Sequence, residues 1–177
     1  AGAAAPPGAA LAVPTDVSDP ASVKALFART RDAYGRLDLL FNNAGAAAFG
    51  TTTEIDPSAW RDLFELNVHS IFSACRSAIP LMKRGGGGAI VNTASISGMG
   101  GDYGLSAYNA AKGAVLNYTR TLALDHARAA QCGFAGGKAF AGGAAAGFGL
   151  GDGFAQFLAL DGDVLWRGIG LGQFLDG

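Results

Sequence analysis

The sequence AIVNTASISGMGGDYGLSAYNAAK occupies residues 89–112 and predicts a strand, a loop and the start of a helix. Ala89 to Thr93 is expected to be a short buried strand, because its β-branched residues lie between a glycine run and a Ser/Gly-rich loop. Ser95 stands at the end of that strand. Ser106 is expected to cap the following helix, whose pattern continues to about Arg128.

The new helix carries a tyrosine and a lysine one turn apart. Tyr108 and Lys112 are four positions apart, so their side chains leave the same face of a helix. A cation beside a phenol favours the ionised form, which makes Tyr108 a candidate general acid/base. Pairs with this spacing also decorate helix surfaces without any function. The surrounding residues therefore decide whether the pair is interpreted as functional.

The region upstream has the pattern of a parallel β-α-β unit. Ser18 or Asp19 is expected to cap a helix that ends at Gly35, and residues 37–41 follow as a buried strand. Asn42-Asn43-Ala44-Gly45 comes directly after this strand. Such a run lets a flat group approach the backbone, although an ordinary Asn/Gly turn has the same composition.

A long helix is predicted from Pro57 to about Arg84, after a cap at Asp56. Pro80 is expected to kink it or nearly end it. Asn67 is unfavourable inside a helix, so it is either a solvated residue or a polar group placed for a purpose. His69 has no suitably spaced second ligand, so no metal site is predicted.

These residues occur in the order and approximate spacing of the short-chain dehydrogenase/reductase family. The run 42–45, Asn67, Ser95 and the pair Tyr108 and Lys112 resemble the family's motifs, and the resemblance covers about residues 11–128. It implies an α/β fold with a Rossmann-type doubly wound parallel sheet. It also implies an oxidoreductase that interconverts an alcohol and a carbonyl with NAD or NADP.

The resemblance assigns a role to each candidate catalytic residue. Ser95 would hydrogen-bond the substrate oxygen, Tyr108 would exchange its proton, Lys112 would assist the tyrosine and hold the ribose, and Asn67 would order a water. The implied cofactor-binding residues are Asp16, Val17, Asn43, Ala44, Gly45, Tyr108 and Lys112. Without the resemblance, Asp16 reads as a turn residue after a short strand at residues 10–13.

Both ends of the chain depart from the family pattern. Residues 1–9 are low-complexity Ala/Gly/Pro, and no phosphate-binding Gly-rich turn precedes Leu11. Residues 129–177 are Gly/Ala-rich and are expected to pack poorly. The segment from Gly133 to Gly177 is expected to lack a continuous family-like strand and helix. This tail is either a divergent extension or the product of a reading-frame change. Weak cofactor binding and little turnover are therefore expected of the chain as given.

The overall composition favours a globular protein with a small-molecule partner. The chain has 177 residues, a hydrophobic content of 50% and a formal net charge of -1, so electrostatics gives no reason to expect a nucleic acid or an anionic membrane. Its two cysteines suggest no disulfide framework, and a cytoplasmic location is expected.

Two alternatives stand beside the dehydrogenase. One is a non-catalytic remnant or interaction module that forms a homo-oligomer through helices 57–84 and 106–128. The other, a methyltransferase-like domain, would leave Ser95, Tyr108 and Lys112 together unexplained.

Overall fold

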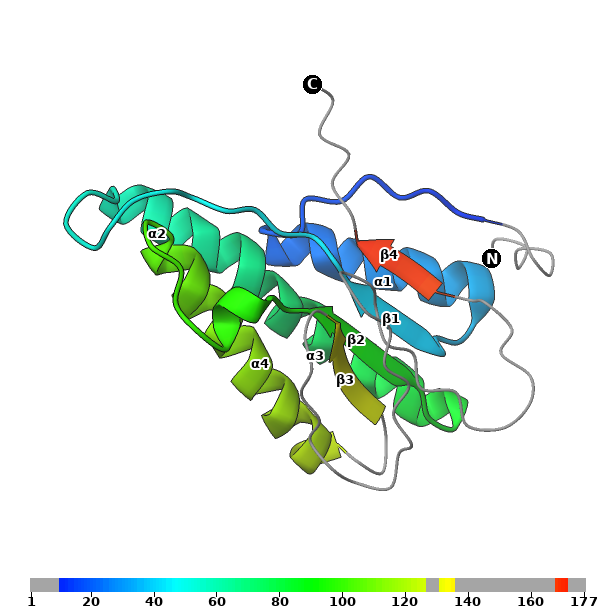
Figure 1. Cartoon of the computed structure of the whole chain (residues 1–177). Helices are drawn as coiled ribbons and strands as arrows, with labels where there is room; N and C mark the ends of the chain where they lie inside the picture. Colours follow the sequence, from blue (N-terminus) through cyan, green and yellow to red (C-terminus); the bar gives the residue numbers. More distant parts are fainter. Residues whose placement is uncertain (1–9, 127–130, 136–167, 172–177) are drawn as a thin grey trace.

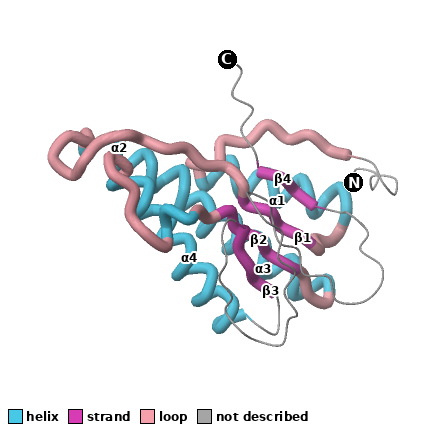
Figure 2. Tube along the Cα trace, viewed as in Figure 1, coloured by secondary structure: helices cyan, strands magenta, loops and turns pink. Residues whose placement is uncertain are grey.

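A computed structural model describes residues 10–126, 131–135 and 168–171. Helices and short parallel strands alternate along this part of the chain (Figures 1 and 2). The elements, in order, are α1 Pro20–Tyr34, β1 Leu39–Asn42, α2 Pro57–Phe64, the π-turn η1 Glu65–His69, α3 Ser70–Gly85, β2 Ala89–Thr93, the 3-10 turn η2 Ile96–Gly98, α4 Ser106–His126, β3 Gln131–Ala135 and β4 Gly168–Leu171.

The described strands form a single four-stranded sheet in the order β3-β2-β1-β4. Every neighbouring pair runs parallel, with Leu40 of β1 opposite Ile90 of β2. The crossover from β1 to β2 contains α2 and α3, and the crossover from β2 to β3 contains α4. This arrangement confirms the predicted α/β, Rossmann-type class.

The ends of α1 follow from local chemistry. The carboxylate of Asp19 accepts hydrogen bonds from the N–H groups of Ala21 and Ser22, which otherwise have no partner in the first turn. Gly35 ends the helix with a φ of 73°, a left-handed conformation that favours glycine. Asp56 caps α2 in the same way, accepting from the N–H of Ser58 at 2.7 Å. The predicted helix starts are confirmed here.

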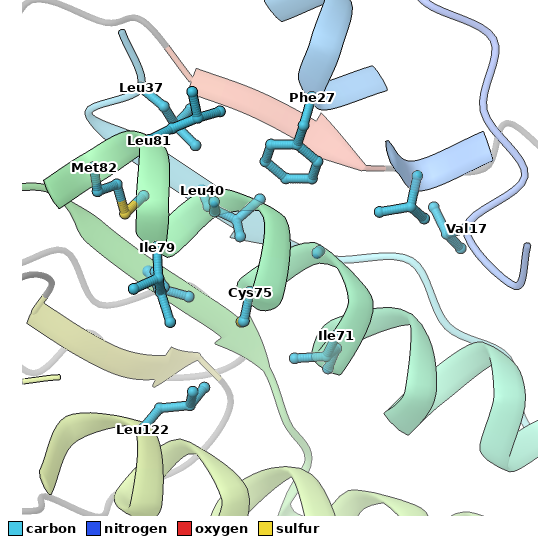
Figure 3. Close-up of a cluster of buried hydrophobic side chains, with 14 of the residues drawn as sticks. Val17, Phe27, Leu37, Leu40, Ile71, Cys75, Ile79, Leu81, Met82 and Leu122 are labelled. Atoms are coloured by element: carbon cyan, nitrogen blue, oxygen red, sulfur yellow. The ribbon is translucent and has the colours of Figure 1, made fainter. Parts of the chain in front are cut away.

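The core lies between the sheet and three helices. Leu40 and Ile90, from the two central strands, belong to one buried cluster with residues of α1, α3 and α4 (Figure 3). Since Leu40 and Ile90 share one face of the sheet, these three helices cover that face. The buried residues of the cluster include Val23, Phe27, Ile71, Cys75, Ile79, Met82, Val115, Leu116 and Leu122. Burial of these apolar side chains holds α1, α3 and α4 against the sheet.

The long helix predicted over residues 57–84 differs from the structure in one respect. A five-residue π-turn, Glu65–His69, separates α2 from α3 and contains Asn67. An extra residue in a turn of this kind is typical of functional positions, and periodicity alone does not reveal it. Pro80 does not end the helix, because α3 continues to Gly85.

Three other expectations differ from the structure. Residues 10–13 form no strand, Leu11 is 39% exposed, and Pro14 has no N–H with which to extend a ladder. Ser106 is the first residue of α4 rather than its cap, because the carbonyl of Leu105 accepts the first helical bond, from the N–H of Asn109. The Ser106 hydroxyl instead donates to the carbonyl of Gly50 at 3.0 Å.

The third difference concerns the Gly/Ala-rich tail. Its residues 131–135 and 168–171 form β3 and β4, each paired over its whole length with a central strand. A strand ladder uses backbone groups, so glycine-rich sequence can join a sheet edge that other strands present. The remainder of the tail lies outside the described residues.

Among the described helices, none combines the length and the apolar composition that crossing a membrane requires.

Candidate active site

The candidate residues meet where the central parallel strands end. Residues 43–45 follow β1, and Ser95 follows β2 by two positions. The first turns of α4 carry Tyr108 and Lys112. The carboxyl ends of parallel strands are the usual ligand-binding edge of an open α/β sheet, so the topology places these groups on that edge.

Lys112 is the centre of the cluster. Its side chain is buried, with 4% exposure, and its ammonium group donates a 2.9 Å hydrogen bond to the carbonyl of Thr93 at the end of β2. The Nζ atom lies 5.6 Å from the centroid of the Tyr108 ring, within the range of a cation–π contact. Burial lowers the pKa of Lys112 to about 8, because desolvation disfavours the ammonium form.

Asn67 reaches the same cluster from the π-turn. Its amide Nδ2 donates to the carbonyls of Ala46 at 2.9 Å and Leu63 at 3.0 Å. The side chain is fully buried, and its Oδ1 atom has no hydrogen-bond partner among the described residues. A buried acceptor without a partner is costly and is expected where a water or a ligand binds.

Gly45 lies between these two groups. A Cβ atom at this position would stand 2.7 Å from Asn67 Oδ1 and 3.5 Å from Lys112 Nζ. The first distance is shorter than real Cβ contacts, so glycine is required for the observed position of the asparagine. Gly45, the Asn67 amide oxygen and the Lys112 ammonium group therefore lie next to one another.

Ser95 is held beside the cluster through the backbone. Its hydroxyl oxygen accepts from the N–H of Ser97 at 3.2 Å and caps η2. The last residue of that turn, Gly98, packs directly on the backbone of α4: a Cβ atom there would lie 2.5 Å from the carbonyl carbon of Lys112. The turn that carries Ser95 and the turn of α4 that carries Lys112 thus touch.

The residues of the run 42–44 have different structural roles. Asn43 is exposed, and its Oδ1 accepts from the Thr93 hydroxyl at 2.9 Å, on the residue whose carbonyl binds Lys112. Ala44 is half-buried and packs against the main core cluster. The buried side-chain amide of Asn42 donates a 2.8 Å hydrogen bond to the side-chain oxygen of Asn92 on the neighbouring strand, which links β1 to β2.

Two candidate cofactor-binding residues make no described contact with the cluster around Lys112. The exposed carboxylate of Asp16 accepts from the hydroxyl and the N–H of Ser18, and these bonds lower the pKa of that carboxyl group. Val17 is buried in the main core cluster. No described contact joins Asp16 or Val17 to Lys112, so the turn interpretation accounts for the geometry of Asp16.

The loop after Ser95 contains contacts that the sequence does not indicate. The Ser97 hydroxyl donates to the carboxylate of Asp102 at 2.5 Å, and the backbone carbonyl of Asp102 accepts from the side chain of Asn109 at 2.9 Å. Asn109 directly follows Tyr108. A Ser/Gly/Asp-rich loop predicts flexibility as readily as a closed network, so no sequence signal separates these two cases.

Gly98→Ala is expected to destabilise the protein by about 1 to 3 kcal/mol, because the new methyl group would meet backbone atoms that have no room to move. The measurement is urea-induced unfolding followed by circular dichroism. Gly100→Ala is the matched control in the same loop, since nothing lies within 4 Å of its Cβ position. Equal stability of the two variants would show that η2 does not pack on α4 as described.

The fold and this cluster define a Rossmann-type α/β domain with a Tyr/Lys pair, and comparison with known proteins identifies the family. A family profile described as short chain dehydrogenase matches residues 2–130. The chain belongs to the short-chain dehydrogenase/reductase family. The predicted resemblance is thereby confirmed.

Individual relatives agree with the family assignment. A meso-2,3-butanediol dehydrogenase from Serratia marcescens is 43% identical over 122 residues, which are 68% of this chain and 48% of that protein. A 3beta-hydroxysteroid dehydrogenase from Mediterraneibacter gnavus is 42% identical over 113 residues, 63% of this chain and 41% of that protein. The chain spans about half the length of the curated relatives that it matches.

A solved structure supports the fold independently. A short-chain dehydrogenase/reductase from Burkholderia xenovorans superimposes with a TM-score of 0.67 at 35% identity, covering 69% of this chain and 49% of that one.

Proposed function

We propose that this protein is an NAD- or NADP-dependent oxidoreductase that interconverts an alcohol and a carbonyl. The observation that supports the proposal best is the convergence of Gly45, Asn67 and Lys112 beside the Tyr108 ring, at the ligand-binding edge of the sheet. The family assignment and the named relatives, which include a butanediol and a hydroxysteroid dehydrogenase, point to the same class of reaction.

In this proposal Tyr108 transfers the proton. Its phenol gives a proton to the carbonyl oxygen during reduction and removes it during oxidation. The buried ammonium of Lys112 stabilises the negative charge that develops on the phenol oxygen, with a strength increased by the low-polarity surroundings. Ser95 orients the substrate oxygen by a hydrogen bond, and Asn67 holds a water with its unpaired Oδ1.

The described residues fit one end of a nicotinamide cofactor. A ribose presents hydroxyl groups, and the site offers an ammonium donor on Lys112 beside a position where only glycine fits. Asn43 lies next to the same strand end. When bound, the cofactor supplies the hydride donor or acceptor of the reaction.

Calorimetric titration with NADH and NADPH, together with a carbonyl-reduction assay, tests the proposal on the 177-residue chain. Weak but saturable binding of one cofactor and slow turnover are expected of this chain, with affinity lowered further in Gly45→Ala because its methyl group would displace Asn67. Gly101→Ala, with nothing within 4 Å of its Cβ position, is the matched control. A chain that binds neither cofactor and reduces no substrate would contradict the proposal.

The alternative of a helix-mediated interaction module relies on the apolar faces of α3 and α4. The structure buries most of these faces against the sheet, in the cluster that contains Ile71, Ile79, Val115 and Leu116. On the side of α3 and α4 away from the sheet, the rings of Phe72 and Tyr118 have centroids 6.4 Å apart. The Arg76 Cζ atom lies 6.0 Å from the centroid of the Phe72 ring. An oligomer formed through α3 and α4 would use this smaller outer surface, and no observation favours the interaction module over the enzyme.

A further inference from the structure

Exposed apolar side chains gather on two loops next to the candidate site. Seven large hydrophobic side chains are exposed among the residues whose burial is described, and four of them lie on the loops that follow β1 and β2. These four, the loop rim, are Phe49 (83% exposed), Ile96 (69%), Met99 (47%) and Tyr103 (94%). Ile96 directly follows Ser95. Exposed apolar groups concentrated at a ligand-binding edge indicate a recognition surface.

The two loops are fastened to each other. The N–H of Gly50 donates to the carbonyl of Gly104 at 2.7 Å, and the Ser106 hydroxyl donates to the carbonyl of Gly50 at 3.0 Å. Gly50 adopts a φ of 146°, and a Cβ atom there would lie 3.1 Å from the backbone of Ile55. Phe49 and Tyr103 each precede a residue of this junction, so the backbone holds both at the same side of the site. The loop rim is therefore preformed.

The same loops carry no cationic side chain that could pair with an anion. Residues 43–55 and 94–105 contain no lysine, arginine or histidine. Their only charged residues are Glu54 and Asp102. Glu54 accepts from the hydroxyl and the N–H of Thr51, and Asp102 accepts from Ser97, so both carboxylates already have partners within the loops. Lys112 lies outside these two loops, is buried, and donates a hydrogen bond to the carbonyl of Thr93.

We infer that the loop rim recognises the apolar body of an uncharged alcohol or ketone and discriminates against anionic substrates such as carboxylates and phosphates. This inference rests on the proposed function and adds a substrate class to it. An apolar group gains from leaving water against Phe49, Ile96 and Tyr103. An anion at the same place loses hydration without gaining a cation, and the two neighbouring carboxylates repel it.

The test uses two ketones of the same ring size and the cofactor-free chain. Saturation-transfer NMR measures the dissociation constants of 4-tert-butylcyclohexanone, which is neutral, and 4-oxocyclohexanecarboxylate, which is an anion. We expect the neutral ketone to bind at least about tenfold more tightly, because a charge without a partner is costly to desolvate. Equal or tighter binding of the anion overturns the inference.

Substitutions locate the binding surface. Phe49→Ser and Tyr103→Ser are expected to weaken binding of the neutral ketone by about three- to tenfold each, in proportion to the apolar area lost. Leu124→Ser is the matched control, since Leu124 is also 83% exposed but lies near the end of α4. If all three variants bind the ketone alike, or if the rim variants change only self-association of the chain, the loop rim is not the substrate surface.

A charge introduced into the rim gives an independent readout. Ile96→Lys is expected to reduce or reverse the preference for the neutral ketone over the anionic one. The new ion pair should strengthen binding of the anion by about tenfold at low salt. An unchanged preference counts against the inference. Circular dichroism confirms that each variant is folded. Since these measurements need no cofactor, they separate failure of the substrate class from failure of the proposed redox function, which the cofactor titration detects.

Discussion

Tyr108→Phe is expected to lower turnover in the carbonyl-reduction assay by about 10² to 10⁴-fold, because the substitution removes the group that exchanges the proton. The change is otherwise small. The phenyl ring keeps its place in the cluster with Trp60, Phe64 and Ala107, and it keeps its position near the Lys112 ammonium. Stability is therefore expected to change little, so that a loss of activity reports on chemistry.

The kinetic pattern distinguishes this role from a structural one. Loss of a group that acts only in the transition state lowers kcat and kcat/KM together. Tyr34→Phe is the matched control: it removes the same hydroxyl from the last residue of α1, outside the loop rim and the Lys112 cluster. If Tyr108→Phe retains full turnover, the phenol of Tyr108 does not transfer the proton, regardless of the roles of the other residues.

Local chemistry made much of the scaffold predictable. The strand at residues 89–93 has the predicted bounds, Asp19 and Asp56 cap the helices expected of them, and Gly35 ends α1. Each of these features is determined by neighbouring residues: β-branched side chains between glycines, a carboxylate before a proline, a glycine after an apolar stripe. The position of Tyr108 one turn before Lys112 follows from helical periodicity for the same reason.

The features that were not predicted depend on contacts between distant residues. The π-turn around Asn67 is accompanied by a hydrogen bond to Ala46, 21 residues earlier, and the Ser106 hydroxyl bonds Gly50, 56 residues earlier. The requirement for glycine at position 98 arises from α4 passing over it. Residues 131–135 and 168–171 form strands by pairing with the open edges of β2 and β1, respectively. The glycine-rich composition of these segments does not predict that pairing.

Burial of Lys112 also arises from tertiary structure, and its consequence for stability is expected to be large. The pKa of this side chain falls from an ordinary value of 10.5 to about 8 in the folded protein, because burial disfavours the ammonium form. Between these two values the unfolded chain holds a proton that the folded chain has released, so the free energy of unfolding rises with pH. Below about pH 8 both states are protonated, and the folded state carries the full cost of the buried charge.

We therefore expect the free energy of unfolding of the wild type, minus that of Lys112→Met, to rise by about 3 kcal/mol between pH 7 and pH 10.5. Urea-induced unfolding at several pH values measures this difference, and subtraction of the methionine variant removes the contribution of all other titrating groups. Lys24→Met, at an exposed position of α1, is the matched control and should leave the pH profile unchanged. Parallel profiles for the wild type and Lys112→Met would show that the ammonium group is solvated, which would also remove the low-polarity environment through which Lys112 is proposed to assist Tyr108.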